Sequence, residues 1–148
     1  MPIPPVPLRP RRRITGMSAV LLPHRDEATV DWNAFEAHVA RTHQAGLTPA
    51  VNMDTGYVQL IDAATRQRVL AVTAQITGGA FVAGAAVADD PGSGFDLDGY
   101  LAAAAEVSDA GGTPIIFPSH GLNDHGDAAW LDGYGRLAGE LPRFIGCE

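Results

Sequence analysis

The sequence has 148 residues and a net charge of −7, with 46% hydrophobic and 18% charged residues. This balance predicts a folded domain with a buried core, and the acidic charge argues against a nucleic-acid partner. A single cysteine, Cys147, excludes an internal disulfide and predicts a reducing, cytoplasmic environment. All ten basic residues are arginine, so no side chain of this polypeptide can supply a lysine amine.

The amino-terminal segment differs in composition from the rest of the chain. Residues 1–13 are rich in proline and arginine and lack the apolar stretch of a secretory signal. We expect 1–13 to be a flexible leader or a strap across the floor of the domain at 14–148, and a patch for an anionic partner is the alternative. No apolar stretch is long enough to cross a bilayer, so no membrane partner is expected.

The first predicted elements form a strand–helix–strand unit. Residues 17–23 are almost continuously apolar, as expected for a strand covered on both faces. Apolar residues recur at helical spacing over 31–44, with Asp31 as a suitable N-cap and Gly46 just beyond the carboxyl end. Residues 48–52 are predicted to be the second strand.

The same alternation continues to the end of the sequence. The remaining predicted elements, in chain order, are a helix over 62–76, a strand over 80–87, a helix over 96–110, a strand over 113–118, a helix over 127–141 and a strand over 143–147. Successive strands are about thirty residues apart, the length of one βα unit. This rhythm predicts an α/β fold with a parallel sheet and right-handed crossovers.

Two architectures fit this alternation, a (β/α)₈ TIM barrel and a doubly wound open sheet. A doubly wound sheet that binds a dinucleotide carries a Gly-x-Gly-x-x-Gly turn after its first strand, but residues 24–27 here are His-Arg-Asp-Glu. The barrel is therefore favoured. Because a complete barrel takes roughly 250 residues, we expect part of one, with strands one to five present and the fifth truncated.

The loop after the second strand resembles that of the dihydrodipicolinate synthase / N-acetylneuraminate lyase family of barrel aldolases. That family carries Gly-Thr-Thr-Gly-Glu there, and this chain has Met-Asp-Thr-Gly-Tyr at 53–57, so Thr55 and Gly56 match. Residues 61–66 continue the family pattern without a gap, and the resemblance covers about 14–148. It implies a divergent member of the family, of which this chain is the amino-terminal half.

The resemblance implies a lyase or aldolase that acts on pyruvate or a related 2-oxo acid without a cofactor. A desolvated lysine on the sixth strand, outside this chain, would form a Schiff base with the keto group. The family binds the acid's carboxylate with its Thr-Gly loop, which implies substrate binding by Thr55 and Gly56. Asp54 lies beside them, although its own charge would repel a carboxylate. Full-length members further imply a homo-oligomer.

The family also places proton-relay tyrosines after the fourth and fifth strands. In this chain His120 stands at the first of these positions, with Ser119 before it as a substrate-binding candidate. Histidine titrates near neutrality and can carry a proton, so His120 is the catalytic candidate together with Tyr57. Gly146 or Cys147 replaces the second tyrosine, so dihydrodipicolinate synthesis itself is not expected.

Structural roles are the alternative for each of these residues. Asp54, Thr55 and Gly56 are common turn formers, and Tyr57 is also expected as a packed loop aromatic. His120 could be a satisfied polar residue at the barrel mouth. The remaining histidine and aspartate candidates are most simply solvated loop residues: His24, Asp89, Asp90 and His125.

Two other functions remain open at this point. A metal-assisted barrel enzyme would use Asp54, His120 and Glu148, which follow three different strands and are ordinary oxygen and nitrogen ligands. The other alternative is an inactive barrel fragment. Five strands cannot close an eight-stranded sheet, so its edges would expose unpaired backbone groups, and the chain alone would aggregate or pair with a second half-barrel.

Overall fold

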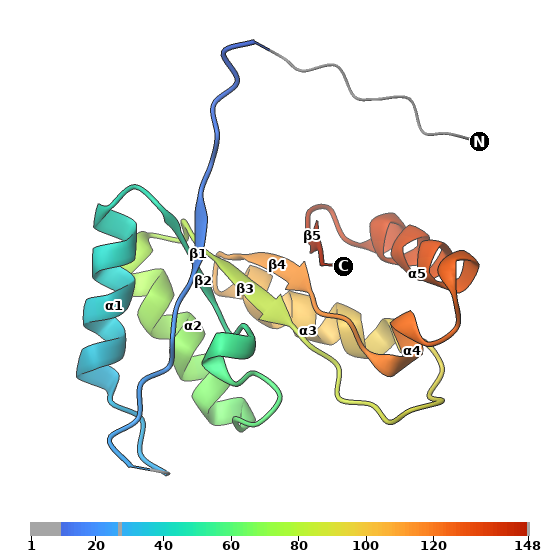
Figure 1. The fold of residues 1–148 in the computed structure, drawn as a ribbon, viewed down its shortest axis with the longest axis horizontal. Helices are drawn as coiled ribbons and strands as arrows, with labels where there is room; N and C mark the ends of the chain where they lie inside the picture. Colours follow the sequence, from blue (N-terminus) through green and yellow to red (C-terminus); the bar gives the residue numbers. More distant parts are fainter. Residues whose placement is uncertain (1–9, 27, 148) are drawn as a thin grey trace.

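The computed structural model describes residues 10–26 and 28–147, so most of the predicted leader, residues 1–9, lies outside the described part (Figure 1). The elements, in chain order, are β1 (Met17–Ala19), α1 (Trp32–Gln44), β2 (Thr48–Val51), the 3₁₀ turn η1 (Asp54–Gly56), α2 (Ala63–Thr77), β3 (Val82–Ala85), α3 (Leu97–Asp109), β4 (Thr113–Ile116), α4 (His120–Asn123), α5 (Asp127–Glu140) and β5 (Ile145–Gly146). No helix in this part of the chain is long and apolar enough to cross a membrane.

The sheet decides between the two predicted architectures. All neighbouring strands pair in parallel, and their order is β1-β2-β3-β4-β5. A doubly wound sheet reverses its winding direction, so its strand order departs from the chain order. Right-handed crossovers that always advance in one direction place their helices on one side of the sheet. The prediction of part of a barrel is therefore confirmed.

The two faces of the sheet carry different residues. Val51, Ala83 and Ile116 pack in clusters that include helix side chains. The neighbouring residues Ala50, Val82 and Ile115 point the other way, into a cluster that, among the described residues, draws only on strands and loops. Because side chains alternate along a strand, this second face corresponds to the interior of the barrel and the first to its helical coat.

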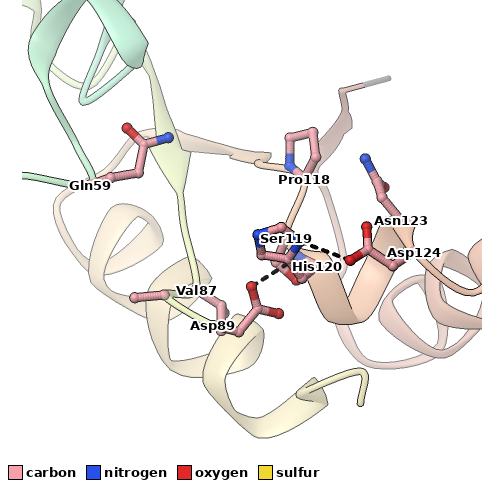
Figure 2. Close-up of a pocket in the computed structure, with 9 residues that line it drawn as sticks. Gln59, Val87, Asp89, Pro118, Ser119, His120, Asn123 and Asp124 are labelled. Carbon is pink, nitrogen blue, oxygen red and sulfur yellow. Dashed lines mark hydrogen bonds and ion pairs between the residues drawn. The ribbon is translucent and has the colours of Figure 1, made fainter. Parts of the chain in front are cut away.

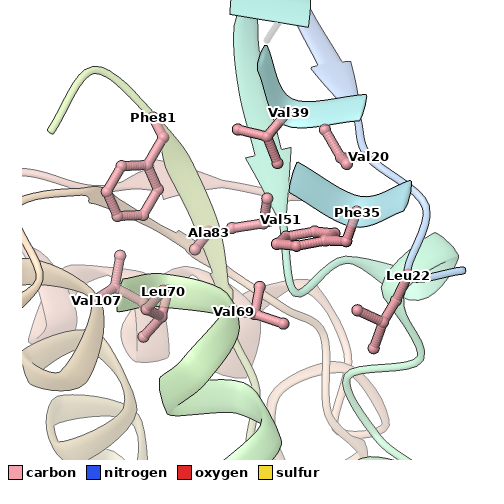
Figure 3. Close-up of a cluster of buried hydrophobic side chains, with 10 residues drawn as sticks. All are labelled: Val20, Leu22, Phe35, Val39, Val51, Val69, Leu70, Phe81, Ala83 and Val107. Atoms are coloured by element: carbon pink, nitrogen blue, oxygen red, sulfur yellow. The ribbon is translucent and has the colours of Figure 1, made fainter. Parts of the chain in front are cut away.

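An apolar cluster packs the first helices of the coat against the sheet (Figure 3). Phe35 and Val39 of α1 and Val69 and Leu70 of α2 are at most 3% exposed and pack around Val51 of β2. Each fully buried side chain of this size contributes roughly 1.5–3 kcal/mol relative to an exposed one. The apolar sides of the first two helices therefore face the sheet.

Aspartate side chains cap three helices, α1, α2 and α3, and these helices begin close to the predicted positions. One carboxylate oxygen of each cap accepts a hydrogen bond from the backbone N–H three residues later, at 3.1, 2.7 and 2.9 Å for Asp31, Asp62 and Asp96 respectively. Such caps satisfy N–H groups that the helix itself leaves unpaired. They fix the starting point of each helix and, with it, the length of the loop that precedes it.

The strands are shorter than the apolar runs that predicted them. β1 ends at Ala19 rather than at residue 23, and β4 ends at Ile116 rather than at residue 118. Val20 and Leu22 are nevertheless buried. Likewise β3 covers Val82–Ala85 and β5 only Ile145–Gly146. Apolar character marks burial, and burial continues past the last strand residue into the loops at the carboxyl ends of the strands.

Candidate active site

Among the hollows of the described structure, two hold candidate residues at the carboxyl ends of the strands, where function concentrates in parallel α/β folds. The first, about 430 Å³, is lined by the loops after β3 and β4, including Asp89 and His120 (Figure 2). The second, also about 430 Å³, is lined by the loop after β2, including Thr55. Gln59 and Pro118 line both hollows. Thr55 and His120 therefore belong to the same rim of the sheet.

The loop after β2 forms a tight turn. Asn52 takes a positive φ of 50°, a conformation that asparagine tolerates better than most residues, and its side-chain amide donates to the Arg66 carbonyl at 3.3 Å. The N–H of Gly56 donates to the Met53 carbonyl at 2.9 Å, so this donor is engaged within the turn. Thr55 is exposed at the tip and lines the second hollow.

Asp54 is held by a residue that the sequence analysis missed. The Gln59 amide donates from Nε2 to Asp54 Oδ1 at 3.0 Å. Gln59 lies across the first hollow from His120 in Figure 2 and borders both hollows. No sequence pattern distinguishes such a loop glutamine, because its importance comes only from where the turn places it. This hydrogen bond partly compensates the negative charge of the Asp54 carboxylate, which lies next to Thr55.

Tyr57 lies away from the other candidates. It has a φ of 58° and is 46% exposed, and its ring meets the His24 ring edge to face with 5.7 Å between centroids. Tyr57 is outside the described walls of both hollows. His24 also contacts the Leu22 carbonyl through Nδ1 at 2.9 Å. The structure therefore groups Tyr57 with His24 and not with His120.

Asp89 connects the loops after β3 and β4, although the sequence favours a solvated loop residue there. Its Oδ1 accepts from the His120 N–H at 2.9 Å and its Oδ2 from the Gly121 N–H at 2.7 Å. Partial burial by itself would raise the pKa of Asp89, but the two N–H donors outweigh it, so the pKa lies below its usual 3.8. The simplest interpretation from sequence was wrong for this residue.

A four-residue helix, α4, follows β4 and was not predicted, because it is too short to show a period. Ser119 is nearly buried and caps it, accepting from the Leu122 N–H at 3.3 Å. His120 begins the helix, and its Nδ1 lies 2.8 Å from Oδ2 of Asp124. The two side chains are 44% and 41% exposed (Figure 2).

Two tyrosines on helices of the coat hydrogen-bond to the backbone that follows β4 and β5. Tyr100 of α3 is fully buried and bonds to the backbone just beyond β4, and burial raises its pKa to about 12. The Tyr134 hydroxyl donates to the Cys147 carbonyl at 2.9 Å and accepts from the Cys147 N–H at 3.2 Å. These bonds join helices of the coat to the carboxyl ends of β4 and β5.

The predicted metal set is only partly within the described structure. Asp54 and His120 line different hollows, and Glu148 lies outside the described residues. Within residues 10–26 and 28–147, no three histidine, cysteine, aspartate or glutamate side chains are grouped so that they could hold a metal ion. Nothing in the described geometry therefore favours the metal-assisted alternative.

Comparison with known proteins shows which solved structures share this fold. The sequence matches no family model and no curated protein sequence. Solved structures do match, among them dihydrodipicolinate synthases from Agrobacterium tumefaciens (22% identity, TM-score 0.67), Rhodopseudomonas palustris (18%, 0.64) and Bacillus clausii (14%, 0.66). These alignments cover 87%, 85% and 89% of this chain but only 42%, 40% and 43% of those chains. The chain thus spans less than half the length of these relatives, and its fold is that of an amino-terminal part of the dihydrodipicolinate synthase barrel.

Proposed function

We propose that this chain supplies one half of the active site of a lyase or aldolase that acts on pyruvate or a related 2-oxo acid through a Schiff base. The lysine must come from outside residues 1–148, because the sequence contains none. The observation that carries the proposal is the common rim: Thr55 and His120 line two hollows that share Gln59 and Pro118. The fold shared with dihydrodipicolinate synthases supports the same assignment.

Thr55 is the proposed contact for the substrate carboxylate. Its side chain is exposed in the second hollow, while the N–H of Gly56 is already bonded to Met53. A threonine hydroxyl donates one hydrogen bond and adapts its direction to the acceptor. The Gln59 amide bound to Asp54 reduces the repulsion that a second carboxylate would meet there.

His120 is the proposed proton carrier. Formation of a Schiff base polarises the former keto carbon, and the adjacent carbon can then lose a proton to a base. A histidine at the edge of the hollow suits this step because one ring nitrogen of a neutral imidazole accepts a proton that the ring can later release. We assign no step to Tyr57, whose ring lies against His24, and we assign Ser119 to capping α4.

The carboxylate contact can be tested on the 148-residue chain, because the proposed subsite lies within it. Titration with pyruvate should give saturable amide shift changes in the loops after β2 and β4 in ¹H–¹⁵N spectra. Thr55→Val should weaken this binding by roughly tenfold, the value of one lost hydrogen bond. Thr15→Val, a change of the same kind at an exposed position ahead of β1, should leave it unchanged. Absence of saturable changes, or equal binding by both variants, would reject the subsite.

The Schiff-base step needs residues 1–148 joined to a segment that supplies strands six to eight with their lysine. Borohydride reduction in the presence of pyruvate should then leave a covalent adduct on that lysine, detectable by peptide mass analysis. Residues 1–148 alone should show no adduct on a side chain. If the completed protein binds pyruvate through Thr55 but never forms a lysine adduct, the site binds an acid without lyase chemistry.

A further inference from the structure

We propose that Asp124 is a positioning residue that holds the His120 imidazole with its proton on Nδ1 and leaves Nε2 as the base at the first hollow. The chemical purpose of this arrangement rests on the function proposed above. The arrangement itself is a property of these 148 residues and can be measured without turnover. It assigns a role to a residue that lies four positions beyond His120 and that the sequence analysis did not single out.

The contact between the two side chains determines the tautomer. His120 Nδ1 and Asp124 Oδ2 are 2.8 Å apart, a distance typical of a strong hydrogen bond to a carboxylate. An ionised carboxylate only accepts hydrogen bonds, so a neutral imidazole paired with it must carry its proton on Nδ1. Neutral histidine in water favours the other tautomer, with the proton on Nε2. Asp124 therefore reverses the default preference of the ring.

The backbone that carries the ring is also fixed. Asp89 accepts from the N–H of His120 and from the N–H of Gly121, so a carboxylate after β3 clamps the start of α4. An exposed ion pair between two mobile side chains is worth little. Here His120 can rotate only about its side-chain bonds, and the short helix places Asp124 where Nδ1 can reach it. The pair therefore forms on a backbone that is held in place, which lowers the cost of ordering the His120 ring.

The other ring nitrogen is available for chemistry. Within residues 10–26 and 28–147, Nε2 of His120 has no hydrogen-bond partner, and the side chain lines the first hollow. The charged groups near His120 are the carboxylates of Asp89, bound to its backbone, and Asp124, bound to its ring. Gln59 on the far side of the hollow is neutral. Nε2 of His120 is thus available as a proton acceptor at the first hollow, while the Asp124 carboxylate holds the opposite ring nitrogen.

The step that follows is a simple proton transfer. The carbon next to the Schiff base loses a proton to Nε2, and the electron pair of that C–H bond moves into the C=N system. The imidazolium that forms keeps its Nδ1–H bond to Asp124, which stabilises the new positive charge. The same division of labour, with one ring nitrogen oriented and the other reactive, operates in histidine bases held by an aspartate.

Long-range ¹H–¹⁵N correlation spectra of the 148-residue chain test the arrangement directly. At a pH where the ring is neutral, the His120 signals, identified by their loss in His120→Gln, should show the proton on Nδ1. Asp124→Ala should shift the ring mainly to the Nε2–H form. Asp132→Ala removes the same charge from an exposed site on α5 and should change nothing. An Nε2–H ring in the unmodified chain, or an unchanged tautomer in Asp124→Ala, would overturn the proposal.

The positioning role of Asp124 and the proposed lyase function can be tested separately. The measurement is turnover by residues 1–148 joined to the segment that supplies the remaining strands and the lysine. Asp124→Ala should lower kcat roughly tenfold, less than the loss expected on removing the base itself, and should leave KM for the 2-oxo acid nearly unchanged. The Nδ1–H tautomer without any turnover would reject the proposed function and retain the positioning role. Full turnover in Asp124→Ala would support the lyase function and reject the positioning role of Asp124.

Discussion

The hydroxyl of Tyr100, in the first turn of α3, donates a 2.5 Å hydrogen bond to the backbone carbonyl of Phe117, the first residue after β4. The Phe117 N–H donates in turn to the Ala85 carbonyl at the end of β3, at 3.0 Å. A helix of the coat is thereby tied to the point where the chain leaves the sheet. Ser119 and His120 lie two and three residues beyond Phe117. The bond therefore anchors the start of the loop that carries His120.

Tyr100→Phe should destabilise the chain by about 1–3 kcal/mol, because it leaves the buried Phe117 carbonyl without its donor. The change removes one oxygen and leaves the ring packing intact. Urea unfolding followed by circular dichroism measures the difference. Tyr57→Phe, at a ring that is 46% exposed, should have little effect. Equal unfolding midpoints for the two variants would show that the bond contributes no stability.

The same tyrosine makes stability depend on pH at the alkaline end. Burial raises the pKa of Tyr100 from 10.0 to about 12, so the folded state retains a proton that the unfolded state loses. Its contribution should be fully present below pH 10 and should fall between about pH 10 and pH 12. The difference in unfolding free energy between the unmodified chain and Tyr100→Phe, measured across this range, should shrink as pH rises. A constant difference would contradict the assignment.

Asp89→Ala should cost roughly 1 kcal/mol at neutral pH, the usual loss when a side-chain cap is removed. Both N–H groups at the start of α4 lose their acceptor. Because the folded pKa of Asp89 is lowered, its contribution is present above the usual value of 3.8 and is lost as pH falls through the lower folded value. Asp90→Ala, the same change at the exposed neighbour, is the control. Identical acid unfolding of the two variants would refute the capping role.

Gly84→Ala should destabilise the chain by about 1–3 kcal/mol, as overpacking of a closed site does. A β-carbon at this position would collide with the Asn52 carbonyl oxygen and lie 3.0 Å from the Phe117 ring. Gly135→Ala on α5 has open space around the added atom and should stabilise the chain by roughly 0.5–1 kcal/mol through helix propensity. Thermal unfolding of both variants gives the comparison. Stabilisation by both changes would mean that β2 and β3 are not packed this closely.

The edges of the sheet should make the 148-residue chain associate. Within residues 10–26 and 28–147, β1 pairs with β2 alone and β5 with β4 alone, and such edges recruit further strands. Met17→Lys places a charge on β1 at a residue that is 50% exposed and should reduce association. Leu131→Lys, at a 63% exposed position on α5, should not. Sedimentation velocity across a concentration series measures both, and a monomeric chain with a sharp two-state melt would contradict the prediction.

Local rules were sufficient for the strands and the four long helices and for their order. The caps Asp31 and Asp62 and the apolar faces of the first helices follow from hydrogen bonding and periodicity within a few residues. The alternation of strands and helices required a parallel sheet. Local rules failed at the ends of strands, where Leu22 is buried although β1 ends at Ala19. Hydrophobicity reports burial and carries no information on which backbone groups are paired.

Residues alone determined the half-barrel rhythm, the absence of lysine and the positions of Thr55 and His120 after β2 and β4. Tertiary structure decided which residues meet: Gln59 with Asp54, and Asp89 with the backbone of His120. Asp89 and His120 are separated by 31 positions, and only parallel strands ending at the same rim bring their loops together. The relevant distances depend on strand register and sheet curvature, which no short segment of the sequence contains.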